Sequence, residues 1–241
     1  MKHKFRFFGR TIGSNEWAIT GEEYEHLRKV LRLKEGEEVE VFDGEGRWGA
    51  GKITEFDKDT AIVLVTQTKK ETLAIPSLVV AIGALQPKTM TDLLPCLVEL
   101  GVDTIHVIEL EGVPKNRTNP KTLDRWRRIL LSSLKQCKRA TMPSFNVWLD
   151  LAPFVQLASE TLPHRWVLDP TATQSIADLE LAGKESICLV MGSESGLSAK
   201  ELEVLEQAGF QKLNLGRFTL RSFTAALSAV AVLSAKRGIG T

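Results

Sequence analysis

From residue 78 onward, short apolar runs alternate with helical patterns, and this alternation restricts the possible folds more than any other feature. Apolar runs of this length, bounded by turn residues, are typical of buried strands. Strands that alternate with helices predict an α/β domain with a largely parallel sheet. Pro95 lacks a backbone donor and is expected to kink the first helix or shift its start. The expected strands cover residues 78–85, 104–110, 165–168, 187–192 and 212–215, and the expected helices cover 93–100, 120–139, 198–208 and 222–237.

The first third of the chain carries a different pattern. Residues 36–66 contain short alternating or β-branched runs separated by turn residues, which predicts a small β-barrel or sheet. Residues 21–33 place apolar side chains at helical spacing, so we expect a short helix packed on this β domain. The polar segment 68–77 contains a proline and marks a domain boundary. We therefore expect two domains, residues 1–72 and 73–241.

The composition excludes several classes of protein. The chain has 241 residues, of which 43% are hydrophobic and 25% charged, a globular composition. Cys96, Cys137 and Cys188 stand too far apart for the paired spacing of a zinc site or a disulfide framework, and the histidines show no ligand spacing. No stretch reaches the roughly 18 apolar residues of a membrane span, and no signal peptide is evident. We therefore expect a cytoplasmic protein with no metal and no membrane partner.

The segment M-G-S-E-S-G-L-S-A-K, residues 191–200, directly follows an apolar strand. Ser198 and Glu201 form the S-x-x-E pattern of a capping box, so a helix is expected to begin at the end of this loop. Glycines at the carboxyl end of a parallel strand let the backbone approach a ligand closely, which predicts a ligand floor. The alternative is a plain strand-to-helix connection that binds no ligand, and the local pattern alone favours the two interpretations about equally. The spacing disfavours a dinucleotide or a nucleoside triphosphate.

Positive charge is concentrated between residues 112 and 143, although the net charge of the whole chain is only +1. This segment holds nine Lys and Arg residues and one acid, Asp124, for a net charge of +8. A solvated helix face normally mixes both signs, so nucleic acid binding is favoured over that alternative. After Glu206 the chain has no acidic residue, and Arg217 and Arg221 continue the basic character. The side chains expected on or beside the wet face of the helix are Arg125, Arg128, Lys135 and Arg139.

The ordered motifs resemble those of the RsmE family, SPOUT-class methyltransferases that methylate N3 of a uridine in bacterial 16S ribosomal RNA. The resemblance runs through H-L-R-K-V-L-R-L-K, V-E-L-G-V, K-Q-C-K-R, M-G-S-E-S-G-L-S-A-K-E and L-G-R-F-T-L-R-S-F-T-A-A-L in order along the chain. It implies an N-terminal PUA-like β-barrel that binds RNA and a C-terminal α/β SPOUT domain with a trefoil knot. It also implies a homodimer, S-adenosylmethionine (SAM) as cofactor, and ribosomal RNA or the small ribosomal subunit as substrate.

The resemblance also assigns candidate site residues. Arg221 is the expected catalytic residue, because a cation near the uracil carbonyls could stabilise the anion that forms when N3 loses its proton. The basic residues Arg125, Arg128, Lys135, Arg139 and Arg217 are expected to bind RNA. The expected cofactor residues are Met191, Gly192, Glu194, Gly196, Leu215, Gly216 and Leu220.

Several motifs depart from the family pattern, and they leave three interpretations open. Ser193 and Ser195 replace a proline and a glycine of the cofactor loop, Phe223 replaces a carboxylate, and Cys96 replaces a lysine. The motifs around Glu111 and at Lys135 and Gln136 are also altered. The first interpretation is an active RsmE-type methyltransferase. The alternatives are an RNA-binding paralogue that has lost turnover and a methyltransferase with a different RNA target.

Overall fold

The computed structural model describes residues 4–73, 76–181 and 185–237. The chain divides into two compact units. The first contains residues 1–72 and 131–142, and the second contains residues 73–130 and 143–241. Each unit has its own sheet and its own hydrophobic core.

The first unit is built on a seven-stranded sheet in the order β1-β4-β5-β6-β3-β2, with β7 paired to β5. The β1–β4 pair is parallel and the other pairs are antiparallel. Alternate side chains point inward, among them Trp17, Val39 and Val63, which are all 0% exposed. The β pattern predicted for residues 36–66 is confirmed. The strands are β1 (Phe5–Phe8), β2 (Arg10–Thr11), β3 (Glu16–Thr20), β4 (Glu38–Phe42), β5 (Arg47–Phe56), β6 (Thr60–Val65) and β7 (Lys69–Lys70).

The helix predicted for residues 21–33 is shorter than expected and changes type along its length. It consists of α1 (Gly21–Glu25) followed by one π-helical turn, η1 (His26–Val30). Leu27 on this segment is fully buried in the barrel core, as the periodicity predicts. The segment ends at Arg32, whose φ of +56° stops further helical winding.

Residues 131–142 belong to the first unit, whereas the sequence pattern places them in the second domain. The Nζ atom of Lys135 lies 2.6 Å from a carboxylate oxygen of Glu23. Nη1 of Arg6 donates to the carbonyl of Lys138 at 2.6 Å. The apolar stripe of the long helix continues across residue 131 without interruption, so the periodicity gives no sign of this change of partner.

The second unit contains a six-stranded sheet in the order β10-β9-β8-β12-β11-β13, and all of its strand pairs are parallel. This confirms the predicted α/β architecture. Strand β10 was not expected, because the partly exposed side chains of this edge strand form no apolar run. The strands are β8 (Leu78–Gly83), β9 (Thr104–Ile108), β10 (Ser144–Trp148), β11 (His164–Leu168), β12 (Ile187–Met191) and β13 (Gln211–Leu213).

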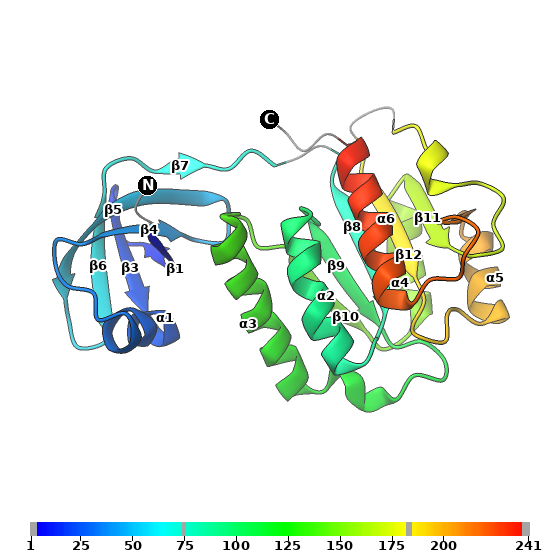
Figure 1. Cartoon of the computed structure of the whole chain (residues 1–241), viewed down its shortest axis with the longest axis horizontal. Helices are drawn as coiled ribbons and strands as arrows, with labels where there is room; N and C mark the ends of the chain where they lie inside the picture. Colours follow the sequence, from blue (N-terminus) through cyan, green and yellow to red (C-terminus); the bar gives the residue numbers. More distant parts are fainter. Residues whose placement is uncertain (1–3, 74–75, 182–184, 238–241) are drawn as a thin grey trace. The chain divides into compact units, whose positions relative to one another are not determined.

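Helices cover both faces of this sheet. Figure 1 shows α2 and α6 side by side over one face, and these two helices are in contact. On the other face, side chains of α4 and α5 form a core cluster with alternate residues of the strands. The helices are α2 (Pro87–Glu99), α3 (Pro120–Cys137), α4 (Leu151–Thr161), α5 (Ala199–Gln207) and α6 (Ser222–Lys236), with short 3₁₀ turns η2 (Lys115–Thr118) and η3 (Ile176–Asp178).

The start predicted for the first helix of this unit is wrong. Helix α2 begins at Pro87, six residues before the expected start at residue 93, and it runs through Pro95 to Glu99. A proline at the first helical position is favourable because its missing donor has no helical acceptor there. Gly101 follows the helix with φ +76°, as expected for a C-terminal glycine. Helix α4 was not predicted, although Asp150 caps it by accepting from the Ala152 amide at 3.2 Å.

One buried histidine makes the stability of the fold depend on pH. His106 on β9 is 5% exposed, and its Nδ1 accepts a hydrogen bond from Trp148 Nε1 at 2.8 Å. Burial lowers the pKa of His106 from 6.5 to about 4. Between these two values the unfolded chain binds a proton that the folded protein does not, so stability present above pH 6.5 is lost as the pH falls toward 4.

We expect this loss to reach roughly 2–3 kcal/mol between pH 7 and pH 4.5, at about 1.4 kcal/mol per pKa unit. In His106→Asn, which keeps an acceptor for Trp148, the free energy of unfolding should fall less over the same range. Urea titrations at both pH values measure the difference, and His26→Asn, on the exposed surface, is the control. Equal pH dependence in wild type and His106→Asn would contradict the prediction.

Candidate functional site

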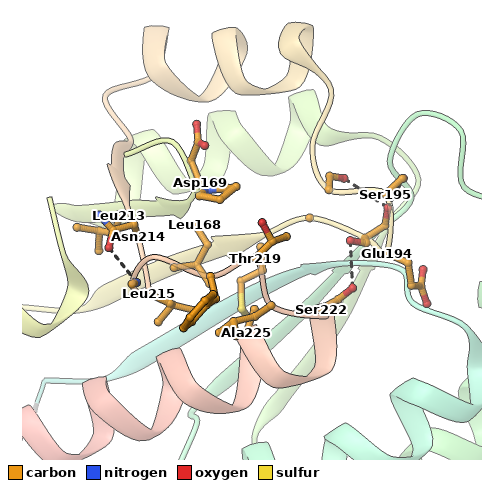
Figure 2. Close-up of a pocket in the computed structure, with 18 residues that line it drawn as sticks. Leu168, Asp169, Glu194, Ser195, Leu213, Asn214, Leu215, Thr219, Ser222 and Ala225 are labelled. Atoms are coloured by element: carbon orange, nitrogen blue, oxygen red, sulfur yellow. Dashed lines mark hydrogen bonds between the residues drawn. The ribbon is translucent and has the colours of Figure 1, made fainter. Parts of the chain in front are cut away.

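A cavity of about 280 Å³ lies where β11, β12 and β13 end. Ligands of α/β proteins usually bind at the carboxyl ends of parallel strands, and this cavity lies at three such ends. Three loops and the first turn of α6 form its walls (Figure 2). The lining residues are Leu168, Asp169, Pro170, Met191, Gly192, Ser193, Glu194, Ser195, Gly196, Leu213, Asn214, Leu215, Gly216, Phe218, Thr219, Leu220, Ser222 and Ala225.

The loop of residues 192–196, called here the glycine loop, is a tight turn that packs on itself. The amide of Gly196 donates to the carbonyl of Ser193 at 3.0 Å, and the hydroxyl of Ser222 donates to the same carbonyl at 3.3 Å. A Cβ atom on Gly192 would lie 2.7 Å from both the Gly196 oxygen and the Leu197 nitrogen. Gly196 itself has φ +81°, which glycine adopts without strain. The two glycines therefore allow this backbone to fold closely against itself.

The predicted capping box at the end of this loop is confirmed. Ser198 Oγ accepts from the Glu201 amide at 3.2 Å, and Glu201 Oε2 accepts from the Ser198 amide at 2.7 Å. The other oxygen of Glu201 accepts from the Glu111 amide at 2.9 Å. Glu201 is 8% exposed, so this carboxylate fixes both the start of α5 and the loop that follows β9.

Glu194 points its carboxylate at the start of α2. Its two oxygens accept from the Gln86 amide at 2.6 Å and from Arg117 Nη1 at 2.7 Å. Burial raises the pKa of Glu194, but the hydrogen bonds from Gln86 and Arg117 outweigh burial, so the pKa lies below its ordinary value. The carboxylate is therefore ionised at neutral pH, and it tethers the glycine loop to the neighbouring segments.

The opposite wall of the cavity is the segment 214–220. Asn214 holds it in place, because its side-chain amide donates to the Ala172 carbonyl at 2.8 Å and its oxygen accepts from the Gly216 amide at 3.0 Å. Leu215 and Leu220 contribute apolar surface, and Phe218 is 68% exposed beside them. Apolar side chains flanked by backbone donors and acceptors suit a flat heteroaromatic ligand.

Sequence reasoning missed Asp169, which lines the cavity and is 5% exposed. Burial raises the pKa of Asp169, but hydrogen bonds from the amide and hydroxyl of Thr171, each 2.8 Å long, and Lys212 at 3.5 Å outweigh it and lower the pKa. An acid directly after the apolar run R-W-V-L was the available signal, since polar groups at strand ends often border ligands.

The structure brings all seven expected cofactor residues to this one cavity, and their role in binding stays a prediction. Arg221 lies elsewhere. It is exposed, stands at the N-cap of α6, and lines a second cavity of about 560 Å³ together with Lys88, Asp92 and Phe223. Glu194 and Ser222 line both cavities, so the two share one border.

The expected RNA-binding residues differ in their surroundings. Arg125 and Arg128 are exposed on α3, whereas Trp126 on the same helix is fully buried. Arg217 is exposed and places its guanidinium over the Phe218 ring at 4.5 Å. Lys135 is 25% exposed in its ion pair with Glu23, so it is less open than the helical pattern predicts. Arg139 is half-buried in the first unit.

The remaining candidate chemistries have little structural support. All three cysteines are free thiols, and burial raises the pKa of Cys188 to about 12. Within residues 4–73, 76–181 and 185–237, no three His, Cys, Asp or Glu side chains gather as a metal site would require. In the same ranges, no helix combines the length and apolar character needed to cross a bilayer.

Two family profiles match the chain. Residues 72–234 match the RNA methyltransferase domain, and residues 19–66 match the RNA methyltransferase PUA domain. The predicted combination of a PUA-like barrel and an α/β methyltransferase domain is thereby confirmed. The trefoil knot stays a prediction.

Known proteins resemble the chain over nearly its full length. The ribosomal RNA small subunit methyltransferase E of Buchnera aphidicola subsp. Schizaphis graminum is 29% identical over 93% of this chain and 92% of its own. The enzyme of the same name from Neisseria gonorrhoeae, solved with bound SAM, is 24% identical and superposes with a TM-score of 0.83 over 97% and 98% of the two chains. A Legionella pneumophila protein solved with bound SAM is 24% identical, with a TM-score of 0.85 over 97% and 98%. The chain belongs to the RNA methyltransferase family, and within it to the RsmE family.

Proposed function

We propose that this protein is a SAM-dependent methyltransferase that methylates N3 of a uridine in 16S ribosomal RNA. The observation that carries the proposal is the cavity at the ends of β11, β12 and β13, which collects all seven expected cofactor residues within the methyltransferase domain. The relatives named as small-subunit ribosomal RNA methyltransferases, and the related structures solved with SAM, support the substrate and the cofactor.

The residues of the cavity fit SAM. The backbone at Gly192 packs so closely that it has no space for a side chain, which suits the floor of a ligand site. Leu215 and Leu220 offer apolar surface for an adenine ring. We infer that backbone groups of the glycine loop and of segment 214–220 hold the adenosine. When bound, SAM supplies a methyl group on a positively charged sulfur. The cavity walls fix the orientation of the reactants, which accounts for much of the acceleration in such reactions.

The target base fits the second cavity. N3 of uridine must lose its proton before or during methylation, and the negative charge then spreads to the uracil carbonyls. Arg221 is a cation at the N-terminus of α6, where the helix dipole adds further positive potential. We infer that Arg221 stabilises this anion, and that the shared border at Ser222 and Glu194 brings the base next to the cofactor.

The proposed partners follow from charge and from the resemblance. Arg125, Arg128 and Arg217 are exposed cations suited to RNA phosphates, and the PUA-like domain provides a second RNA-binding surface. Half-buried apolar residues of α6, namely Leu227, Ala231 and Val232, are suited to pair with a second copy of the chain, in agreement with the expected homodimer. Action on ribosomal RNA also implies a cytoplasmic protein.

One observation favours a second candidate, a methyltransferase with a different RNA target. Phe223 is half-buried and lines the second cavity, where the resemblance places a carboxylate. An aromatic ring in that position stacks on any base and carries no hydrogen-bonding group to read one. The surroundings of the target base are therefore altered, while the cofactor loops keep their glycines.

Radiolabelled methyl transfer tests the proposed function. The protein is incubated with methyl-labelled SAM and 16S ribosomal RNA, free or in 30S subunits, from a strain that lacks the family enzyme. We expect incorporation that stops at about one methyl group per RNA and that mass spectrometry locates at N3 of a uridine. Labelling of another nucleotide would favour the second candidate. If SAM binds without transfer to any RNA, the protein is a paralogue without turnover and the proposal is wrong.

A further inference from the structure

Arg117 connects three segments of the second unit that are far apart in sequence. It lies in η2, between β9 and α3, and its Nη1 donates to the Ala84 carbonyl at 2.6 Å. The same nitrogen donates to Glu194 Oε2 at 2.7 Å, across 77 residues. Ala84 directly follows β8, and Glu194 lies in the glycine loop. One guanidinium therefore joins the loops that follow the neighbouring strands β8 and β12.

The surroundings of this contact make it stronger than an ordinary surface ion pair. Exposed pairs contribute little because water screens the charges and both side chains lose freedom. The Arg117 side chain is only 15% exposed, and that of Glu194 is 35% exposed. The second oxygen of Glu194 also accepts from the Gln86 amide at 2.6 Å. Two charged groups and two backbone groups are thus satisfied together, which limits the positions open to the glycine loop.

The carboxylate of Glu194 is occupied by these contacts, and the side chain lies at the edge of the residues that line the cavity (Figure 2). Its neighbours in sequence, Ser193 and Ser195, form the floor and are joined by a 3.0 Å hydrogen bond between their hydroxyls. The main role of Glu194 is therefore to position the floor of the cavity, and contact with a ligand is secondary.

We propose that Arg117 is a positioning residue, which holds the glycine loop in its cofactor-binding shape through Glu194. The inference rests on the proposed function, because it concerns the same SAM site. Arg117 does not line the cavity, so its effect on the cofactor is transmitted by the loop. Loss of the guanidinium leaves the Glu194 carboxylate with one partner fewer and frees the floor to move.

The experiment compares Arg117→Gln, Glu194→Gln and the double variant by calorimetric titration with SAM. We expect each single variant to raise the Kd about tenfold, which corresponds to the loss of one charge-assisted contact. The double variant should be no weaker than the worse single variant, because the two residues act as one unit. Arg117→Lys keeps a cation that can reach one partner, and should recover part of the affinity.

Lys200→Gln is the matched control, because it removes one positive charge from an exposed residue just beyond the same loop. Its Kd should stay within about twofold of wild type. Melting temperatures are measured alongside, because a merely structural role would lower stability and leave the affinity of the folded fraction unchanged. Arg117→Gln with wild-type affinity, or effects that multiply in the double variant, would overturn the positioning role.

A separate readout distinguishes failure of this inference from failure of the proposed function. If the wild-type protein binds no SAM, the proposed function fails, but hydrogen exchange in the absence of cofactor still tests the role of Arg117. Amides of residues 192–196 should exchange several times faster in Arg117→Gln than in wild type. Unchanged exchange in this loop would refute the role without reference to SAM.

Discussion

Gly192→Val is expected to weaken SAM binding by about 100-fold or more while leaving the protein folded. A side chain on Gly192 has no space, because its Cβ would lie 2.7 Å from the Gly196 oxygen and the Leu197 nitrogen. The backbone φ of Gly192 lies outside the left-handed region, so the effect comes from crowding and not from an unfavourable conformation. The glycine loop must open to admit the side chain, and the floor of the cavity moves with it.

Calorimetric titration with SAM measures this loss, and circular dichroism with thermal melting reports on the fold. Gly13→Val is the matched control. The three atoms nearest to a Cβ on Gly13 all belong to the Glu16 side chain, the closest being an oxygen at 3.1 Å, and that side chain can turn away. The control variant should bind SAM as wild type does. Wild-type affinity in a folded Gly192→Val protein would remove the glycine loop from the cofactor site.

Reversal of charge at Arg125 and Arg128 is expected to lower the affinity for ribosomal RNA by about 100-fold at moderate salt. Both residues are exposed on α3, within the segment whose net charge is +8. Each cation that neutralises a phosphate releases bound counterions, so binding weakens as salt rises. In Arg125→Glu/Arg128→Glu, the slope of log K against log salt should fall by roughly 1.4, about 0.7 for each lost phosphate contact on single-stranded RNA.

Filter binding or fluorescence anisotropy over a range of salt concentrations gives both quantities. Lys200→Glu, which reverses the charge of an exposed residue on α5, is the control and should keep most of the affinity. SAM binding should be unaffected in both proteins, which verifies the fold. If the α3 variant keeps the wild-type affinity and salt slope, α3 does not contact RNA.

The parts of the fold that local patterns specify could be predicted from the sequence. Strands β8 and β12 are buried on both faces, so they appear as continuous apolar runs. The capping box depends on residues three positions apart, and Ser198 and Glu201 form it as expected. The stripe of Trp126, Leu130 and Leu134 on α3 is buried as its helical spacing predicts.

The parts that depend on tertiary contacts could not be predicted. The two contacts of Arg117 lie 33 and 77 residues away in sequence. Its position in the basic segment 112–143 predicted RNA binding, and nothing in the sequence indicated that its partner is a carboxylate. Residues 131–142 join the first unit through contacts with Glu23 and Arg6, which no periodicity reveals. Strand β10 lies at the edge of its sheet with partly exposed side chains, so it lacks the apolar run of its neighbours.

The same distinction applies to the site. The glycines after the apolar run 187–191 predicted the glycine loop, because the crowding at Gly192 is a local restriction. The opposite wall, with Leu215, Gly216 and Leu220, was expected only from the family resemblance. Asp169 could have been noticed as an acid directly after an apolar run, but its contacts with Thr171 and Lys212 appear only in three dimensions. Sequence therefore identified the residues of the cavity better than the residues that hold its walls in place.

Calorimetric titration of the wild-type protein with SAM, repeated with its demethylated product, tests the central claim most directly. The account predicts micromolar binding of both compounds with about one site per chain, because the cavity is formed within a single chain. Absence of binding in a folded protein would contradict it. If RNA affinity persisted in that case, the protein would be an RNA-binding member of the family without methyltransferase activity.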